Sequence, residues 1–195
     1  MKKTIVIASN NKHKIKEFRD VLTEYDIITL NDIGYDNDIE ENGKTFKENA
    51  IIKAETIHKY IKQQGLEYIV MADDSGLCVE SLNGEPGVFS ARYAGEHGNN
   101  EANRRKLQKK LIGKKRDAYF ICSIAVFYPN GEYKTFEGKT YGKITEEELG
   151  NKEFGYDCIF YSNDLNKTFG QATEEEKNKV SHRGRAIMEM VKGIK

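Results

Sequence analysis

Two adjacent carboxylates, Asp73 and Asp74, follow an apolar run at residues 68–71 and precede Ser75 and Gly76. The apolar run predicts a buried strand, and the glycine predicts a turn directly after the carboxylates. Polar groups at the end of a buried strand stand where α/β enzymes keep their chemistry. Because side chains alternate between the faces of a strand, we expect Asp73 and Asp74 to point in opposite directions, so that only one enters a given cleft. Hydrogen bonding within the turn is the alternative role.

A second polar segment lies between a predicted strand at residues 4–8 and a predicted helix at about residues 12–24. It consists of Ser9, Asn10, Asn11, Lys12, His13 and Lys14. Free backbone N–H groups, a hydroxyl and lysines at a strand-to-helix junction can hold phosphate oxygens. The spacing is not that of a Walker sequence, and a helix cap with solvated lysines is the alternative.

A polar, acidic connection at residues 31–43 contains Glu40 and Glu41. Glu40 and Asp74 offer oxygen ligands of the kind that Mg²⁺ prefers, with water and substrate phosphate filling the other positions. Neither residue belongs to a His-rich zinc pattern. Glu41 is the rival to Glu40, and a solvated loop carboxylate is the alternative for both.

The next predicted helix begins at Thr45, because Thr45 and Glu48 have capping-box spacing, and Gly65 ends it. Its buried face is predicted to consist of Ala50, Ala54, Ile57 and Ile61. Asn49 and Lys53 are one turn apart on a different face, which looks either into a cleft or into solvent.

The last third of the chain combines cations with aromatic rings. Ser181 can cap the final helix, which places His182 and Arg183 in its first turn, and Lys177 lies close by in sequence. Arginine at a helix N-terminus suits an anion or an electron-rich heterocycle, whereas solubilising surface is the alternative. Aromatic residues beside Gly155, at positions 154 and 156, form either a wall for a flat base or part of the core.

The remaining pattern predicts a mixed sheet flanked by helices. Residues 119–128 and 132–144 predict two strands of an antiparallel hairpin around a turn at residues 129–131, and strand–helix units precede them. A charged helix at about residues 101–111 looks surface-lying, and residues 80–98 look irregular with short strands. The final helix is predicted to bury Ile187, Met188, Val191 and Ile194, and the helix at 12–24 to bury Ile15, Phe18, Val21 and Leu22.

Composition narrows the partners and the compartment. The 195 residues fit one domain or two closely joined lobes, and 31 Lys and Arg balance 31 Asp and Glu, so no overall cationic field attracts nucleic acid or an anionic membrane. Three widely spaced cysteines, Cys78, Cys122 and Cys158, argue against a disulfide framework and favour a reducing cytoplasm. No segment reaches transmembrane length, and none has the apolar core of a signal peptide.

From end to end, the chain resembles the inosine triphosphate pyrophosphatases, which remove non-canonical purine nucleoside triphosphates from nucleotide pools. Six blocks in the family's order carry the resemblance: residues 8–14 (ASNNKHK), 45–50 (TFKENA), 72–77 (ADDSGL), 86–93 (PGVFSARY), 154–157 (FGYD) and 181–184 (SHRG). Two positions depart from the pattern. Asn10 stands where a glycine is common, and Tyr156 stands where some members have Trp.

The resemblance implies a role for each matching residue. Ser9, Asn10, Asn11, Lys12, His13 and Lys14 would hold the triphosphate, with Lys53 nearby. Glu40 and Asp74 would engage Mg²⁺, and Asp74 would also accept a proton. Ser75 would contact substrate, the nucleoside pocket would be walled by Phe154, Gly155, Tyr156 and Asp157, and the purine nucleotide would be contacted by Lys177, His182 and Arg183.

The resemblance also implies an elongated α/β fold with a long central mixed sheet, two lobes with a substrate cleft between them, and a homodimer. The expected reaction is hydrolysis of ITP, dITP or XTP to the monophosphate and pyrophosphate. Maf-type nucleotide pyrophosphatases, which prefer other bases, are the alternative enzyme, but they lack the Ser-His-Arg-Gly ending. A nucleotide-binding sensor without turnover is the alternative outside enzymes, and the combination of Asp74, Glu40 and Lys53 argues against it.

Overall fold

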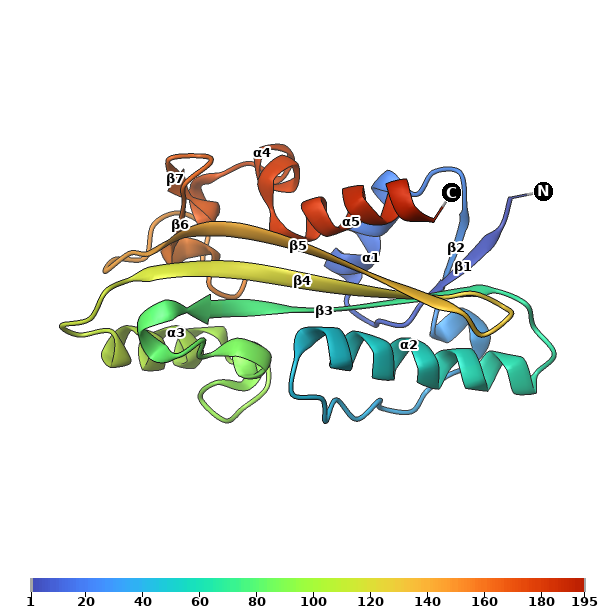
Figure 1. The fold of residues 1–195 in the computed structure, drawn as a ribbon. Coiled ribbons are helices and arrows are strands. Elements are labelled where there is room, and N and C mark those ends of the chain that lie inside the picture. Colours follow the sequence, from blue (N-terminus) through green and yellow to red (C-terminus); the bar gives the residue numbers. More distant parts are fainter. Residues whose placement is uncertain (1, 195) are drawn as a thin grey trace. The chain divides into compact units, whose positions relative to one another are not determined.

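The structure, a computed structural model, describes residues 2–194. Within that range seven strands form one mixed sheet in the order β2-β1-β3-β4-β5-β6-β7 (Figure 1). The strands are β1 (Thr4–Ile7), β2 (Asp26–Thr29), β3 (Ile69–Val79), β4 (Asp117–Phe127), β5 (Tyr133–Ile144), β6 (Phe160–Ser162) and β7 (Lys167–Thr168). β1 pairs in parallel with β2 and β3, whereas β6 pairs antiparallel with β5 and β7. The predicted mixed sheet is therefore confirmed.

The helices are α1 (Lys12–Val21), α2 (Phe46–Gln63), α3 (Asn100–Lys110), α4 (Glu174–Val180) and α5 (His182–Gly193). None of the helices in residues 2–194 is long and apolar enough to span a bilayer. α2 begins where the sequence predicts, because the Thr45 hydroxyl accepts the Glu48 N–H at 3.1 Å. The Glu48 carboxylate accepts the N–H of Lys44 at 2.6 Å, whereas in a capping box it would accept the N–H of Thr45.

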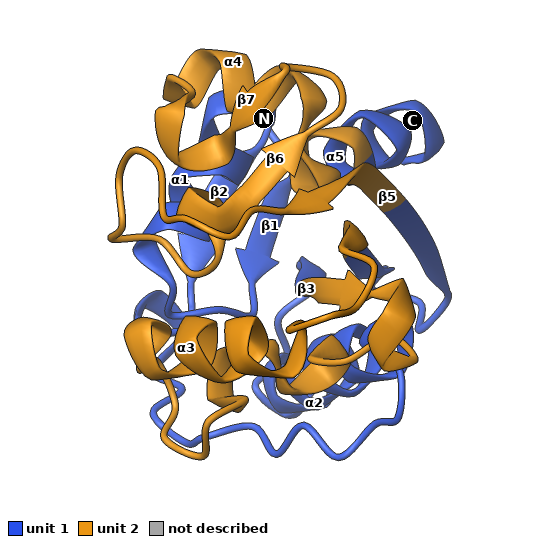
Figure 2. Cartoon of the chain, turned by 90° about the vertical axis from the view of Figure 1, so that its left-hand side faces the viewer, with its two compact units in different colours: residues 1–74, 122–137, 186–195 blue, residues 75–121, 138–185 orange. Residues whose placement is uncertain are grey.

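The chain divides into two compact units, which Figure 2 colours separately. Unit 1 contains residues 1–74, 122–137 and 186–195, and unit 2 contains residues 75–121 and 138–185. The boundary in β3 falls between Asp74 and Ser75, and β4 and β5 likewise contribute residues to both units. The single domain, the elongated shape and the substrate cleft stay predictions.

Unit 1 has an apolar cluster on each face of its strands. On one face Ile5 and Ile7 of β1 pack with Phe18 of α1 and with Ile187 and Met190 of α5. On the other face Val6 and Ala8 pack with α2, through the predicted residues Ala50, Ala54, Ile57 and Ile61. Successive residues of β1 thus serve opposite faces, as strand geometry requires.

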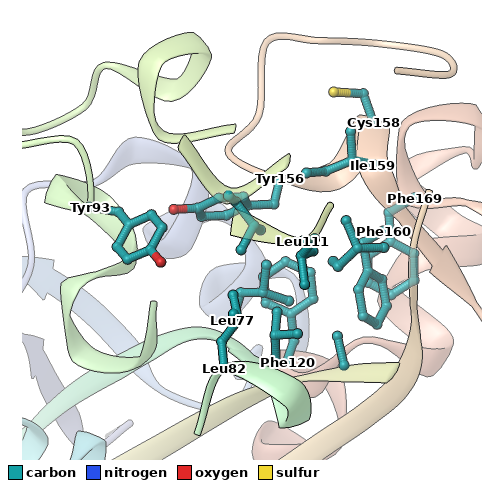
Figure 3. Packing of buried hydrophobic residues seen from close by; sticks show 14 residues of the cluster. Leu77, Leu82, Tyr93, Leu111, Phe120, Tyr156, Cys158, Ile159, Phe160 and Phe169 are labelled. Atoms are coloured by element: carbon teal, nitrogen blue, oxygen red, sulfur yellow. The ribbon is translucent and has the colours of Figure 1, made fainter. Parts of the chain in front are cut away.

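Unit 2 has its own core (Figure 3). Leu107 and Leu111 at the end of α3 belong to the same cluster as Leu77 of β3 and Phe120 of β4. The cluster continues through the residues around β6 and β7, namely Tyr156, Cys158, Ile159, Phe160 and Phe169. Residues 156–160 therefore contribute side chains to the core of unit 2.

The predicted turn after Asp74 is wrong, because β3 continues through Ser75 and Gly76 to Val79. Leu77 and Val79, beyond the glycine, are fully buried, and their burial favours extension of the strand over a turn. The short strands expected at residues 80–98 are also replaced, by 3₁₀ turns at Glu80–Leu82 and Gly87–Arg92.

Two predicted core positions face solvent. Val21 is 47% exposed because α1 ends there and Leu22, rather than Val21, completes the stripe that Ile15 and Phe18 begin. Met188 is 49% exposed because Ala186 and Met190, one turn apart, face inward and leave Met188 on the opposite side of α5. The hydrophobic stripe of each helix is therefore narrower than its composition indicates.

Candidate active site

The two aspartates of β3 point to opposite faces, as predicted. Ile69 and Met71 belong to the cluster under α1 and α5, and Val70 and Ala72 belong to the cluster under α2. Asp73 continues the first series and Asp74 the second, so each carboxylate meets a different helix. The alternation gives each carboxylate its own partners.

Asp73 lies against α1. Its carboxylate is fully buried and forms an ion pair with Lys14 Nζ at 2.9 Å. Cys122 Sγ lies 3.8 Å from the same carboxylate oxygen. A buried carboxylate is stable only with such compensation, so Asp73 fixes the position of the Lys14 ammonium.

Asp74 lies against α2. Asn49 Nδ2 donates to Asp74 Oδ2 at 3.0 Å, and Lys53 Nζ lies 3.8 Å from Asp74 Oδ1. Burial raises the pKa of the Asp74 carboxyl, against the opposing effects of Lys53 and Asn49. Asn49 and Lys53 are both buried, so this face of α2 looks into the protein and not into bulk water.

Lys53 connects Asp74 with the acidic loop that precedes α2. Its ammonium donates to Glu41 Oε1 at 3.2 Å. Burial by itself lowers the pKa of Lys53, but Asp74, Asp73 and Glu41 outweigh it, and the pKa lies above its ordinary value. Lys53 is therefore a fixed positive charge among carboxylates.

Glu41, and not Glu40, makes this contact. Glu41 is half-buried and faces Lys53, whereas Glu40 is exposed on the neighbouring position of the loop. The role of Glu40 as a metal ligand stays a prediction, and the rival that the sequence offered is the residue that faces the Asp74 cluster.

The loop at residues 9–14 is held by hydrogen bonds between its own residues. Asn11 Oδ1 accepts the backbone N–H groups of His13 at 3.0 Å and Lys14 at 3.2 Å, and Ser9 Oγ accepts the N–H of Asn11 at 3.2 Å. Asn11 is thus the cap of α1. Asn10 and Lys12 remain exposed beside it, so the segment forms the helix cap that the sequence offered as one alternative, and phosphate binding by this loop stays a prediction.

In unit 2, Arg183 and Ser75 form a pair. Arg183 Nη2 donates to Ser75 Oγ at 3.0 Å, and the arginine is buried at the start of α5. Its neighbour His182 is also buried and stacks on Phe120, with ring centroids 4.8 Å apart and an interplanar angle of 15°. Ser181 Oγ accepts the N–H of Gly184 at 3.0 Å and so caps the helix, as predicted.

The aromatic segment of unit 2 divides into a core residue and a more accessible one. Tyr156 is buried, its hydroxyl donates to the carbonyl of Ser90 at 2.8 Å, and burial raises its pKa. Phe154 is only partly buried, and Lys177 Nζ lies 4.8 Å from its ring centroid. Lys177 also pairs with Asp157. Phe154, Asp157 and Lys177 therefore form one local group, whereas Tyr156 belongs to the buried core of unit 2.

Asn49 is the residue of this site that the sequence left without a role. Its side chain bridges two distant segments, because Oδ1 accepts the N–H of Gly43 at 2.8 Å while Nδ2 donates to Asp74. The signal was its place one turn before Lys53, inside the block at residues 45–50. Gly43 is part of the same arrangement, since a Cβ there would lie 2.6 Å from Asn49 Oδ1.

The carboxylates of this site suit a Mg²⁺ ion that also binds water and phosphate oxygens. No group of three Asp, Glu, His or Cys side chains within residues 2–194 is arranged to hold a metal by itself. Mg²⁺ commonly binds one or two carboxylates and completes its shell with water and phosphate oxygens, and the buried Asp74 carboxylate meets that requirement. The donor set therefore fits a cation that arrives with an anionic substrate.

Comparison with known proteins agrees with this chemistry. The chain matches the Ham1 family over residues 5–193. It is 48% identical to the dITP/XTP pyrophosphatase of Clostridium perfringens, over 99% of this chain and 98% of that protein. It is 45% identical to the dITP/XTP pyrophosphatase of Bacillus subtilis, over 97% of this chain and 96% of that protein. The solved structure of the Staphylococcus aureus Ham1 protein has a TM-score of 0.88 at 45% identity and covers 99% of this chain and 100% of its own.

Proposed function

The chain belongs to the Ham1 family, and from this premise we propose that it hydrolyses non-canonical purine nucleoside triphosphates, ITP, dITP and XTP, to the monophosphate and pyrophosphate. It is thus a hydrolase that acts on acid anhydrides. The observation that carries the proposal is the full-length similarity to proteins named dITP/XTP pyrophosphatase.

Asp74 is the residue to which we assign the proton transfer. In the proposed reaction a water oxygen bonds to the α-phosphorus, the bond from that phosphorus to the bridging oxygen breaks, and pyrophosphate leaves. The proton of the water passes to the Asp74 carboxylate. The bond from Asn49 supports this role, because it orients the carboxylate and leaves Oδ1 directed toward Lys53.

Two lysines of unit 1 would neutralise the triphosphate. Lys14 is held by Asp73 and Lys53 by Asp74 and Glu41, so neither ammonium has to be ordered when substrate binds. Fixed charges that need no reorganisation stabilise a developing phosphoryl charge most effectively. Ser9, Asn10, Asn11, Lys12 and His13 would complete the phosphate contacts from the loop before α1.

Mg²⁺ would be held by Asp74, with Glu40 or its neighbour Glu41 as the second carboxylate. When bound, the ion supplies charge neutralisation at the phosphate oxygens. The contact between Glu41 and Lys53 supports Glu41 as the candidate to test beside Glu40.

The residues of unit 2 would bind the nucleoside. Ser75, the first residue of unit 2 in β3, would contact the substrate beside Arg183, which donates a hydrogen bond to it. Phe154, Gly155, Tyr156 and Asp157 would form the wall of the base pocket, and Lys177, His182 and Arg183 would supply the cationic and ring contacts. A hydrogen-bond donor in the pocket would be paired with the 6-oxo group of hypoxanthine or xanthine. With adenine the same donor would face an amino group and stay unpaired, which is costly and would favour oxo purines.

A panel of triphosphates tests the proposal. The purified protein is given Mg²⁺ with ITP, dITP, XTP and the four normal deoxynucleoside triphosphates, and pyrophosphate and orthophosphate are measured separately. We expect pyrophosphate from the three oxo purines and little from dATP. Preference for another base would favour a Maf-type activity, and binding without any turnover would favour a sensor.

Two additions extend the panel. Chelation by EDTA should abolish turnover and added Mg²⁺ should restore it. With ATP added to the panel, Arg183→Ala should erase the preference for ITP over ATP. Light scattering of the same sample tests the predicted homodimer.

A further inference from the structure

Helix α3 has a buried arginine on its inner face. The sequence predicts a charged surface helix, and Arg105 fits that expectation because its side chain is 78% exposed and pairs with Glu101. Arg104, the preceding residue, is only 4% exposed. A guanidinium is rarely buried without a set of acceptors that needs its planar, forked geometry.

Those acceptors belong to the segment before Tyr156. Arg104 Nε donates to Glu148 Oε1 at 2.7 Å, and Nη1 donates to the carbonyls of Lys152 at 3.3 Å and Gly155 at 2.9 Å. Glu148 also pairs with Lys152 Nζ at 3.1 Å through its other oxygen. The Arg104 side chain is therefore hydrogen-bonded to both ends of the segment 152–155.

A second side chain of α3 strengthens the attachment. Asn100 Nδ2, one turn before Arg104, donates to the carbonyl of Glu153 at 3.2 Å. Gly155 has φ +45°, in the left-handed region, so the backbone turns sharply where the guanidinium holds it. The side chains of α3 thus satisfy three backbone carbonyls of a segment that lies outside the helices and strands.

This segment carries the residues assigned above to the base pocket. Phe154 lies between the carbonyls held by Arg104, and Asp157, which pairs with Lys177, follows the turn at Gly155. The position of the Phe154 ring relative to Lys177 depends on the backbone at residues 152–155. A buried arginine that fixes those carbonyls fixes the wall as well.

We propose that Arg104 is a positioning residue for nucleoside binding, one that holds the segment 152–155 in the conformation that receives the base. The inference rests on the proposed function, because it takes Phe154 to Asp157 as the wall of the base pocket. Arg104 acts through the backbone and has no contact with the reacting phosphate in this role. Its loss should weaken binding of the nucleoside and leave the chemical step nearly intact.

Arg104→Met tests this, with Arg105→Met as the matched control on the same helix. For Arg104→Met we expect KM for dITP to rise about tenfold and kcat to change less than about twofold. This is the pattern seen when a substitution weakens binding of the substrate and of the transition state equally. The inhibition constant of pyrophosphate, which has no base, should stay at the wild-type value. Hydrogen exchange should accelerate in a peptide covering residues 151–158. Arg105→Met should leave all four quantities unchanged.

Other results would overturn the inference. An unchanged KM for dITP, or an equal loss of pyrophosphate and dITP binding, would mean that Arg104 is only a general support of the fold. If Arg104→Met does not unfold cooperatively, Asn100→Ala is the milder variant, with an expected rise in KM of about threefold and the same unchanged pyrophosphate constant. A wild-type protein that releases no pyrophosphate from dITP or XTP would refute the proposed function instead, and the exchange measurement would still report whether Arg104 holds the segment.

Discussion

Asn49 donates to Asp74 across 25 residues of sequence, with 3.0 Å between Nδ2 and Oδ2. The same carboxamide accepts the N–H of Gly43, so the acidic loop, α2 and β3 meet at one side chain. A neutral side chain therefore holds one oxygen of the Asp74 carboxylate, while the Lys53 ammonium lies 3.8 Å from the other.

Asn49→Ala should lower kcat for dITP by about 10- to 100-fold, because partners that orient a metal ligand or catalytic carboxylate commonly contribute this much. Gly43→Ala should act in the same direction, since its Cβ would lie 2.6 Å from Asn49 Oδ1 and displace the carboxamide. Steady-state kinetics of both variants and of the double variant check this. The double variant should be no worse than the poorer single one, whereas additive losses would show that the two residues act separately. Lys47→Ala, exposed on α2, is the control.

Asp74→Asn should reduce turnover by roughly 10²–10⁴-fold, the usual contribution of a positioned general base. The fold should persist, because an amide fills the same volume and removes a charge whose burial is unfavourable. Pyrophosphate release and a urea unfolding curve measure the two effects. Retention of wild-type turnover would transfer the proton-acceptor role away from Asp74, and Asp38→Asn on the exposed loop is the matched control.

Ser123→Ala should stabilise the protein by about 1 kcal/mol, because a buried hydroxyl without a hydrogen bond carries an uncompensated desolvation cost. Ser123 in β4 is 1% exposed, and its Oγ has no hydrogen-bond partner among residues 2–194. Ser90→Ala is the opposite case, since Ser90 Oγ accepts the Leu77 N–H at 2.9 Å and donates to the Gly87 carbonyl at 2.6 Å. It should cost about 1–3 kcal/mol. Urea unfolding of both variants tests the contrast, and destabilisation by Ser123→Ala would contradict it.

The Arg104–Glu148 pair should make part of the stability dependent on pH. The hydrogen bond from Arg104 lowers the pKa of Glu148 below its ordinary 4.5. Because the pKa of Glu148 is lower in the folded protein than in the unfolded chain, its ionised carboxylate stabilises the fold at pH values above the unfolded-state pKa. This contribution is lost as the pH falls from about 4.5 through the folded-state pKa. The free energy of unfolding of wild type should exceed that of Glu148→Gln at pH 7, and the difference should shrink below pH 4. A difference that stays constant with pH would argue against the assignment.

Short-range pattern was enough to predict the elements that carry the site. The cap at Thr45, the buried stripe from Ala50 to Ile61 and the opposite directions of Asp73 and Asp74 all follow from helix and strand periodicity, and the structure agrees. Each depends on neighbours within a few residues, where backbone geometry leaves little choice. The six blocks that carry the family resemblance are likewise readable without coordinates.

Only the tertiary structure decided which partner each polar side chain takes. Gly76 lies inside a strand because residues beyond it are buried, Glu41 rather than Glu40 meets Lys53, and Arg104 is buried while Arg105 is exposed. In sequence the two glutamates are alike, and so are the two arginines. What separates the members of each pair is their burial and the hydrogen-bond partners that other segments of the chain supply, because the free energy of a polar group depends on its surroundings in the folded chain more than on its type.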